Sequence, residues 1–191
     1  MKLLSQKTVL VNAQRRRLLQ LAAIGAAAAL LPACSDQKPV AGPAQGDRFP
    51  DIVLPDLDGR LAPFSAYSNV ALIVNFWATW CEPCRREMPD LEKLSTLFRL
   101  GDLRVIGVTV DNDANLAREF GLRLKLTFPL VSDSKQALSS GALRITGFPT
   151  TYLLKRDHSI ASIIVGAREW AEPKMIDEIE QQLAVRRLAA V

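Results

Sequence analysis

The chain has few of the side chains that most often bind metals. Its 191 residues include one histidine, His158, and three cysteines. A zinc site needs about four ligands, and the obvious candidates are only His158, Cys81 and Cys84. We therefore expect no metal site, and we expect His158 to be a solvated residue in a turn predicted at residues 156–159.

The sequence also lacks a comfortable membrane span and a strong charge excess in its main part. The alanine-rich apolar stretch at residues 18–31 is shorter than the roughly 20 residues that a spanning helix needs. Residues 1–33 contain five basic side chains and no acidic one, and removing these five charges from the total of +4 leaves −1 for the rest. Nothing therefore indicates nucleic-acid binding.

The first 33 residues are typical of an export signal. Residues 14–20 (QRRRLLQ) are similar to a twin-arginine signal. Residues 31–34 (LPAC) are similar to a lipobox, in which Cys34 would be lipidated and become the mature N-terminus. We predict a membrane-anchored lipoprotein at the periplasmic face. An uncleaved anchor helix and ordinary cleavage near Ala33 are the alternatives.

The two remaining cysteines have the layout of a redox site. Cys81 and Cys84 lie between an apolar run at residues 70–76, predicted to be a buried strand, and a helix predicted over residues 85–98. The free N–H groups and the positive dipole end at a helix N-terminus stabilise an anion. The reacting anion is the Cys81 thiolate, and Cys84 can then close the ring. The only redox group expected is a Cys81–Cys84 disulfide, with no other cofactor.

The order of elements predicts an α/β sandwich. A hairpin is expected around Asp58-Gly59 between residues 51–54 and 60–63. Periodicity predicts further strands at residues 103–110, 127–131, 150–154 and 160–165, and helices at 111–121, 134–140 and 169–185. Met88, Leu91, Leu94 and Phe98 form one apolar stripe on the first helix. Residues 34–47 are predicted to be a flexible tether, and residues 48–191 the folded domain with a mixed sheet.

The motifs around the cysteines resemble those of the thioredoxin superfamily, and within it those of the TlpA/ResA-like membrane-tethered thiol–disulfide oxidoreductases. The resemblance covers about residues 47–186 and is carried by residues 75–84 (NFWATWCEPC), 85–89 (RREMP), 147–150 (GFPT), 49–51 (FPD) and 58–59 (DG). It implies a thioredoxin-like three-layer sandwich with an N-terminal hairpin and a helical insert.

The resemblance also implies roles for individual residues. Cys81 would be the exposed attacking thiol and Cys84 the shielded resolving thiol. A cis peptide bond would join Phe148 to Pro149 opposite the disulfide and leave the Phe148 backbone free to pair with an extended substrate. The residues implied or expected to form the substrate-binding surface are Trp80, Glu82, Pro83, Phe148, Pro149 and Thr150. Trp77 and Trp170 are expected to be packing residues.

Glu87 is the candidate proton shuttle. Thioredoxin has a buried aspartate where this chain has Asn75, and an asparagine cannot take the proton of Cys84. Glu87 matches an active-site carboxylate of ResA-like members and lies about one helical turn after Cys84. Partial burial would raise its pKa and suit it to proton transfer. The alternative is a solvated surface residue beside Arg85 and Arg86.

The predicted function is thiol–disulfide exchange on exported proteins, with the enzyme acting as a reductant. The resemblance implies apocytochrome c or an oxidase copper-assembly factor as client, and a membrane electron donor as the source of electrons. A second reading is a thioredoxin-fold binding module with a structural disulfide, although so short a loop would give little stabilisation. Copper-centre assembly itself is a third, but Sco-type chaperones have a C-x-x-x-C motif. A peroxiredoxin would need a different cysteine motif.

Overall fold

The structure, a computed structural model, describes residues 41–189. The predicted export signal, Cys34 and most of the predicted tether lie outside these residues. Between residues 41 and 189, no helix is both long enough and apolar enough to cross a membrane.

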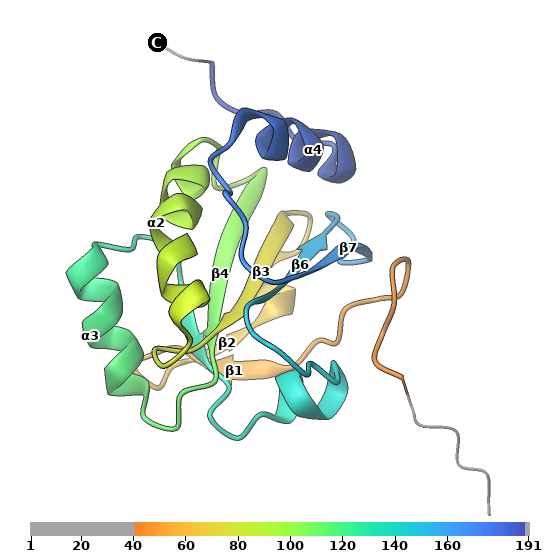
Figure 1. Ribbon diagram of the computed structural model, residues 1–191. Coiled ribbons are helices and arrows are strands. Elements are labelled where there is room, and N and C mark those ends of the chain that lie inside the picture. The colour runs from red at the N-terminus through yellow and green to blue at the C-terminus, as the bar shows by residue number, and fades with distance from the viewer. Residues whose placement is uncertain (1–40, 190–191) are drawn as a thin grey trace, which may run out of the picture. The chain divides into compact units, whose positions relative to one another are not determined.

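A five-stranded mixed sheet forms the centre of the domain, in the order β5-β4-β3-β6-β7 (Figure 1). The central strand β3 (Ala71–Trp77) is parallel to β4 (Leu103–Thr109), which is parallel to β5 (Leu130–Ser132). On the other side β6 (Thr150–Leu154) is antiparallel to β3 and to β7 (Ile160–Val165). Every residue of β3 is buried, as its continuous apolar run predicts.

The two faces of the sheet are covered by different elements. Ile73 and Trp77 of β3 pack in one apolar cluster with residues of α2 (Glu82–Thr96), α3 (Ala114–Leu124) and α4 (Pro173–Leu183). The intervening residues Leu72, Val74 and Phe76 pack in a second cluster with the N-terminal hairpin and with residues after β5. Because successive side chains of a strand point to opposite faces of the sheet, other elements pack on both faces, and the predicted three layers result.

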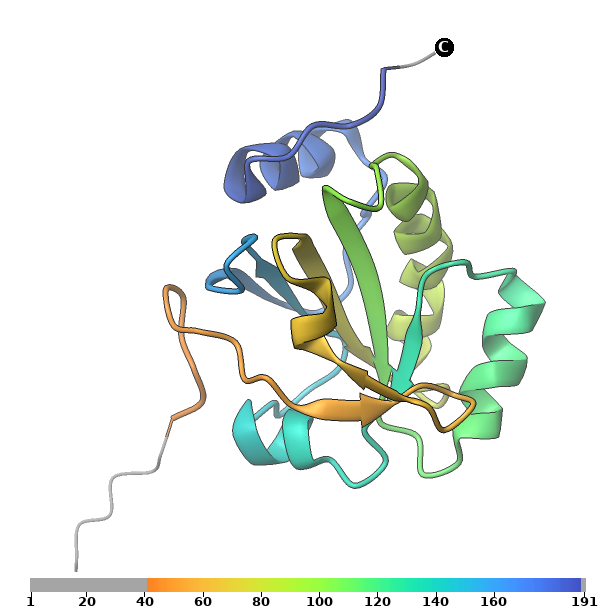
Figure 2. The same cartoon turned by 180° about the vertical axis from the view of Figure 1, so that it is seen from behind.

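The N-terminal hairpin lies on the second face, as the view from behind shows (Figure 2). It pairs β1 (Val53–Pro55) with β2 (Leu61–Pro63), and a 3-10 turn, η2 (Phe64–Tyr67), follows it. The predicted turn is present, with Gly59 at φ +84°. Glycine adopts such a positive φ without a steric penalty.

The helix α3 runs three residues past its predicted end. The sequence indicated a stop at Gly121, but the helix ends at Leu124 and Lys125 caps it with φ 55°. Gly121 is instead a packing residue, since a Cβ there would lie 2.9 Å from Leu130 Cδ1. The glycine allows the helix to lie close to β5.

Other boundaries also differ from those predicted: α2 begins at Glu82 rather than at residue 85, and β5 covers Leu130–Ser132 rather than residues 127–131. The short helix expected at residues 134–140 is a π-helical turn, η3 (Ala137–Ala142). The last helix begins at Pro173 rather than at residue 169, because Glu172 is its N-cap and proline suits the first helical position. Residues 166–172 therefore form a loop between β7 and α4, which the site described below uses.

The end of the predicted tether is joined to the sheet. The Gly46 N–H donates to the Ile160 carbonyl at 2.8 Å, and the Ile160 N–H donates to the Asp47 carbonyl at 2.8 Å. Backbone hydrogen bonds to β7 are thus made by Gly46 and Asp47, within the segment predicted to be a tether.

Candidate active site

Cys81 stands at the junction between β3 and α2. It is the N-cap of α2, and a disulfide joins it to Cys84, with a Cα–Cα distance of 5.3 Å. The Cys84 backbone N–H donates to Cys81 Sγ at 3.3 Å. Pro83 occupies the first turn, where its missing N–H costs no hydrogen bond. The predicted position of the pair at a helix N-terminus is confirmed.

A buried aspartate fixes the loop that leads into Cys81. Asp111 lies just after β4, and its carboxylate accepts hydrogen bonds from the Thr79 N–H at 3.0 Å and from the Thr79 hydroxyl at 2.9 Å. The Thr109 hydroxyl donates to the same carboxylate at 2.7 Å. Sequence reasoning missed Asp111. The available signal was an acidic residue at the carboxyl end of a strand parallel to the one before the cysteines.

The two sulfur-bearing residues differ in exposure. Cys84 is fully buried, whereas Cys81 is 6% exposed. Cys81 is therefore more shielded than the resemblance implied, but it is the only one of the two that solvent touches. A substrate sulfur can approach the disulfide only from the Cys81 side.

An exposed aromatic surface borders Cys81. Trp80 is 66% exposed, and its ring lies edge-on to Phe148 at 5.9 Å between centroids. The Phe148–Pro149 peptide bond is cis, as the resemblance implied. Pro149 and Thr150 differ from the other expected surface residues, because both are buried. The Thr150 hydroxyl donates to the Gly147 carbonyl at 2.8 Å.

Glu82 lies on the exposed first turn of α2. Its carboxylate accepts a hydrogen bond from Arg86 at 2.6 Å, and both side chains are well exposed. Opposite charges four residues apart on a helix are neighbours. The arginine offsets the negative charge that Glu82 brings close to Cys81.

Glu87 is buried, so the surface alternative is wrong. Asn75 Nδ2 donates to Oε1 at 2.8 Å, while the Arg168 N–H at 3.0 Å and Trp170 Nε1 at 2.9 Å donate to Oε2. Burial raises the pKa of Glu87, and the three hydrogen bonds and the charge of Arg168 oppose that rise. The sequence predicted Trp170 as a packing residue but gave no sign of its bond to Glu87.

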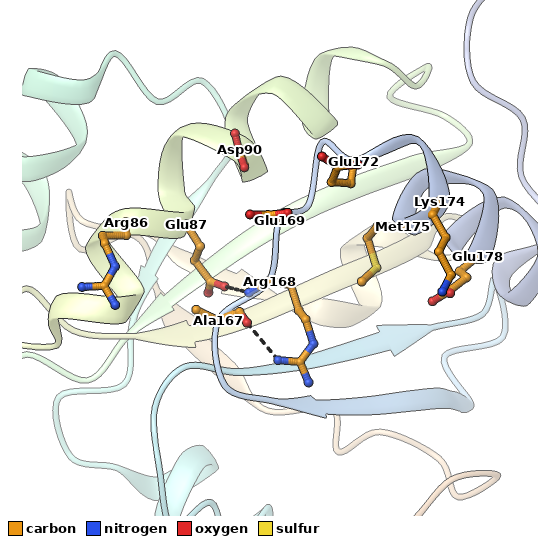
Figure 3. A pocket seen from close by; sticks show the side chains of 10 residues that line it. All are labelled: Arg86, Glu87, Asp90, Ala167, Arg168, Glu169, Glu172, Lys174, Met175 and Glu178. Carbon is orange, nitrogen blue, oxygen red and sulfur yellow. Dashed lines mark hydrogen bonds between the residues drawn. The ribbon is translucent and has the colours of Figure 1, made fainter.

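A pocket of about 780 Å³ opens beside Glu87, between α2 and the segment that leads into α4 (Figure 3). Charged side chains dominate its lining: Arg86, Glu87, Asp90, Arg168, Glu169, Glu172, Lys174 and Glu178. In Figure 3 the Glu87 carboxylate points toward the Arg168 backbone. The pocket brings solvent close to a carboxyl group that is itself buried.

Two further residues, which the sequence analysis did not place in the site, have the following positions. Trp77 is fully buried in the core, as expected. His158 is in the turn between β6 and β7, as predicted. Its side chain is half-buried rather than fully solvated, and its Nε2 lies 3.2 Å from the Tyr67 carbonyl. It is therefore less solvated than predicted. No group of three or more potential metal ligands was found over residues 41–189.

Comparison with known proteins places this geometry in a family. The family model described as Redoxin matches residues 44–183. The chain belongs to the Redoxin family. That match covers the hairpin, the sheet, both cysteines and α4.

Curated relatives and solved structures agree with this family. The thiol-disulfide oxidoreductase ResA of Geobacillus thermodenitrificans is 34% identical over 123 residues, which is 64% of this chain and 70% of the relative. The thioredoxin-like protein YneN of Bacillus subtilis is 33% identical over 127 residues, 65% of this chain and 74% of that protein. The crystal structure of a putative thiol:disulfide interchange protein DsbE from Chlorobium tepidum superposes with a TM-score of 0.64 at 26% identity. It covers 74% of this chain and 96% of that one.

The family, the relatives and the Cys81–Cys84 disulfide agree on the activity. This Redoxin-family chain is a thiol–disulfide oxidoreductase with a thioredoxin-like fold.

Proposed function

We propose that this oxidoreductase reduces disulfides in exported proteins, with Cys81 as nucleophile and Cys84 as resolving thiol. The observation that carries the proposal is the asymmetry of the pair: Cys81 caps α2 and is partly accessible, while Cys84 is sealed in the core. A thiolate at a helix N-terminus is stabilised, and a sealed thiol reacts only with its neighbour.

The exchange balances over two steps. The Cys81 thiolate attacks a substrate disulfide, an S–S bond forms between enzyme and substrate, and one substrate thiolate leaves. Cys84 then loses its proton, and its thiolate attacks Cys81 Sγ and expels the second substrate thiolate. The substrate gains two electrons, and the enzyme is left with the Cys81–Cys84 disulfide. A membrane dithiol donor then reduces this disulfide in the same two steps run in the opposite direction.

Glu87 takes the proton of Cys84 in the second step. It lies one helical turn beyond Cys84 on α2, it is buried, and burial raises its pKa. A carboxyl group with a raised pKa is a better proton acceptor at neutral pH than an exposed one. The neighbouring pocket gives the proton a route to solvent.

The client protein docks on the surface beside Cys81. Trp80 and Phe148 form its aromatic edge, and Glu82 and Pro83 border the reacting sulfur on α2. The backbone at Phe148-Pro149 pairs with an extended substrate strand, and buried Thr150 holds this loop through Gly147. Large exposed aromatic side chains are typical of protein-binding surfaces.

The cellular setting that we propose rests on the sequence. Residues 1–33 direct export, Cys34 carries a lipid anchor, and the domain works at the periplasmic face. The client is an exported protein with a reducible disulfide. Apocytochrome c or a copper-assembly factor of an oxidase fits this description.

A trapping experiment tests the proposal. In Cys84→Ser, Cys81 can still attack a substrate disulfide, but no second thiol can release the bound substrate. Mixed disulfides should therefore accumulate in the native envelope and disappear when reductant is added. Mass spectrometry would name the partner. Cys81→Ser is the matched control and should trap nothing. Equal trapping by both variants, or none by Cys84→Ser, would contradict the assigned roles.

A further inference from the structure

In all three hydrogen bonds of the Glu87 side chain, the carboxyl group accepts and its partner donates. Oε1 accepts from Asn75 Nδ2 at 2.8 Å, and Oε2 accepts from the Arg168 N–H and from Trp170 Nε1. This set suits a carboxylate. A protonated carboxyl group must instead donate one hydrogen, so one of these partners has to become an acceptor when a proton arrives.

Two of the three partners cannot make that change. A backbone N–H and an indole N–H are donors only. A proton on Oε2 would therefore face Arg168 and Trp170 with no acceptor. The side-chain amide of Asn75 carries an acceptor as well as a donor, so of the three protein partners only Asn75 can accept the proton, and it would accept it from Oε1.

We propose that Asn75 is a positioning residue whose side-chain amide turns over when Glu87 gains a proton. In the carboxylate state Nδ2 faces Oε1, and in the acid state Oδ1 faces Oε1 and accepts from its O–H. The proposal rests on the proposed role of Glu87 as acceptor of the Cys84 proton. It explains how Glu87 keeps its bonds to Arg168 and Trp170 in both states.

The surroundings of Asn75 permit the turn. Its Nδ2 also donates to the Thr151 hydroxyl at 2.9 Å. A hydroxyl both donates and accepts, so Thr151 can donate to Oδ1 after the amide turns. Within the described part of the chain Oδ1 has no hydrogen-bond partner, so no bond on that side holds the amide in one orientation.

Because the site is buried, a proton on Oε1 needs an acceptor from the protein, and the turned Oδ1 supplies it. Asn75 is fully buried and Thr151 is 1% exposed. Water cannot replace a lost partner at such a position, and an unpaired buried polar group is destabilising. The proton change on Glu87 is therefore balanced by these two side chains.

The other charges near Glu87 lie on the pocket side. They come from α2, from the loop after β7 and from the start of α4: Arg86, Asp90, Arg168, Glu169, Glu172, Lys174 and Glu178. Several of them are carboxylates, so a bulk pH profile would not report on Glu87 alone. The test must observe Glu87 and Asn75 directly.

Nuclear magnetic resonance of the labelled, oxidised full-length chain provides that test. On acidification the Asn75 side-chain amide signals should shift with the same midpoint as the Glu87 carboxyl carbon. The Trp170 indole N–H should stay hydrogen-bonded throughout. If the indole N–H instead loses its bond while the Asn75 signals stay constant, the proton resides on Oε2 and the proposal is wrong.

A pair of substitutions provides a second test. Thr151→Val removes the Thr151 bond in both states, but in the carboxylate state it leaves a buried Nδ2 hydrogen with no acceptor, whereas in the acid state the turned Oδ1 still has its bond to Glu87. The variant should therefore favour the acid and raise the Glu87 midpoint by about one pH unit. Thr151→Ser keeps the hydroxyl and should leave the midpoint unchanged. With a fixed amide the Thr151 bond would be the same in both states, so an unshifted midpoint in Thr151→Val overturns the proposal.

A negative result in these tests is distinguishable from a negative result in the trapping experiment that tests the proposed function. They use the oxidised protein without substrate or turnover. A fixed Asn75 would leave the Cys81 and Cys84 roles intact. Failure of Cys84→Ser to trap a partner would leave the response of Asn75 to Glu87 unchanged.

Discussion

At the scale of single residues, Glu87 is subject to opposing influences on its charge. Burial destabilises the carboxylate and raises its pKa, while Trp170, Arg168 and Asn75 stabilise it through hydrogen bonds. The balance favours a raised pKa. A group that differs in pKa between the folded and unfolded chain makes stability depend on pH.

The first prediction concerns this pH dependence. The folded pKa of Glu87 lies above its unfolded value of 4.5, so the stabilisation is complete below about pH 4.5 and is lost as pH rises through the folded pKa. Glu87→Gln resembles the neutral acid and does not titrate. Relative to this variant the wild type should lose about 1.4 kcal/mol for each pH unit between the two pKa values. Urea unfolding across this range measures the difference.

The matched comparison isolates one group, because the other titrating side chains are the same in both proteins. A stability difference between wild type and Glu87→Gln that stays constant with pH would mean that burial does not raise the Glu87 pKa.

Sequence reasoning located some of these residues and not others. The C-x-x-C spacing identified Cys81 and Cys84, whereas Glu87 was identified from the resemblance to ResA-like proteins, with helix geometry placing it about one turn after Cys84. Arg168 and Trp170 follow Glu87 by 81 and 83 residues, and only the folded chain brings them to its carboxylate. The sequence showed that Asn75 cannot take the proton of Cys84, but it did not show that Asn75 contacts Glu87 and Thr151, because these residues belong to different elements.

At the scale of elements, close packing between strands and helices decides where glycine is needed. Gly107 lies in β4, and a Cβ there would lie 2.6 Å from Leu130 Cδ2 and 3.1 Å from Phe128 Cε2. The indole nitrogen of Trp77 would be 3.2 Å away. The side chains around β4 leave no room for a methyl group.

The second prediction follows from this crowding. Gly107→Ala should lower the free energy of unfolding by about 1–3 kcal/mol, as overpacking of a core does. Gly101→Ala is the control, since a Cβ there meets no atom within 4 Å, and it should change stability by no more than about 0.5 kcal/mol. Denaturant unfolding compares the two. Equal effects would show that β4 and its neighbours shift without cost.

Element types were predictable to a greater extent than element ends. Strands β6 and β7 and the apolar stripe of α2 agree with the predictions, because period and apolar content are local properties. The end of α3 and the start of α4 were wrong by three and four residues. Gly121 suggested a stop, but its absent side chain serves packing against Leu130.

At the scale of the whole molecule, the segment before the hairpin completes the core. Phe49 is 3% exposed, and its ring lies edge-on to Phe64 and Tyr152 at 5.4 and 5.3 Å between centroids. Backbone bonds from Gly46 and Asp47 tie the same segment to Ile160. The face of the sheet opposite the helices is therefore closed by residues from the N-terminal side of the domain.

The third prediction tests this closure. Phe49→Ala should cost about 3–5 kcal/mol of folding stability, the range for truncating a buried aromatic side chain. Leu61→Ala in the same hairpin region is the control, because Leu61 is 74% exposed and its loss should be nearly neutral. Thermal or urea unfolding would compare them. Similar stability for both variants would mean that the segment is not part of the cooperative core.

By itself the sequence determined the chemistry of the cysteine pair and the α/β class, and its resemblance to ResA-like proteins indicated the carboxylate on the helix of the cysteines. These features depend on local motifs and on strand and helix periods along the chain. Only the tertiary structure decided which donors bind Glu87, which side chain fixes the loop before Cys81, and which segment covers the second face of the sheet. Those contacts join residues far apart in the chain, and the packing of the whole domain selects them.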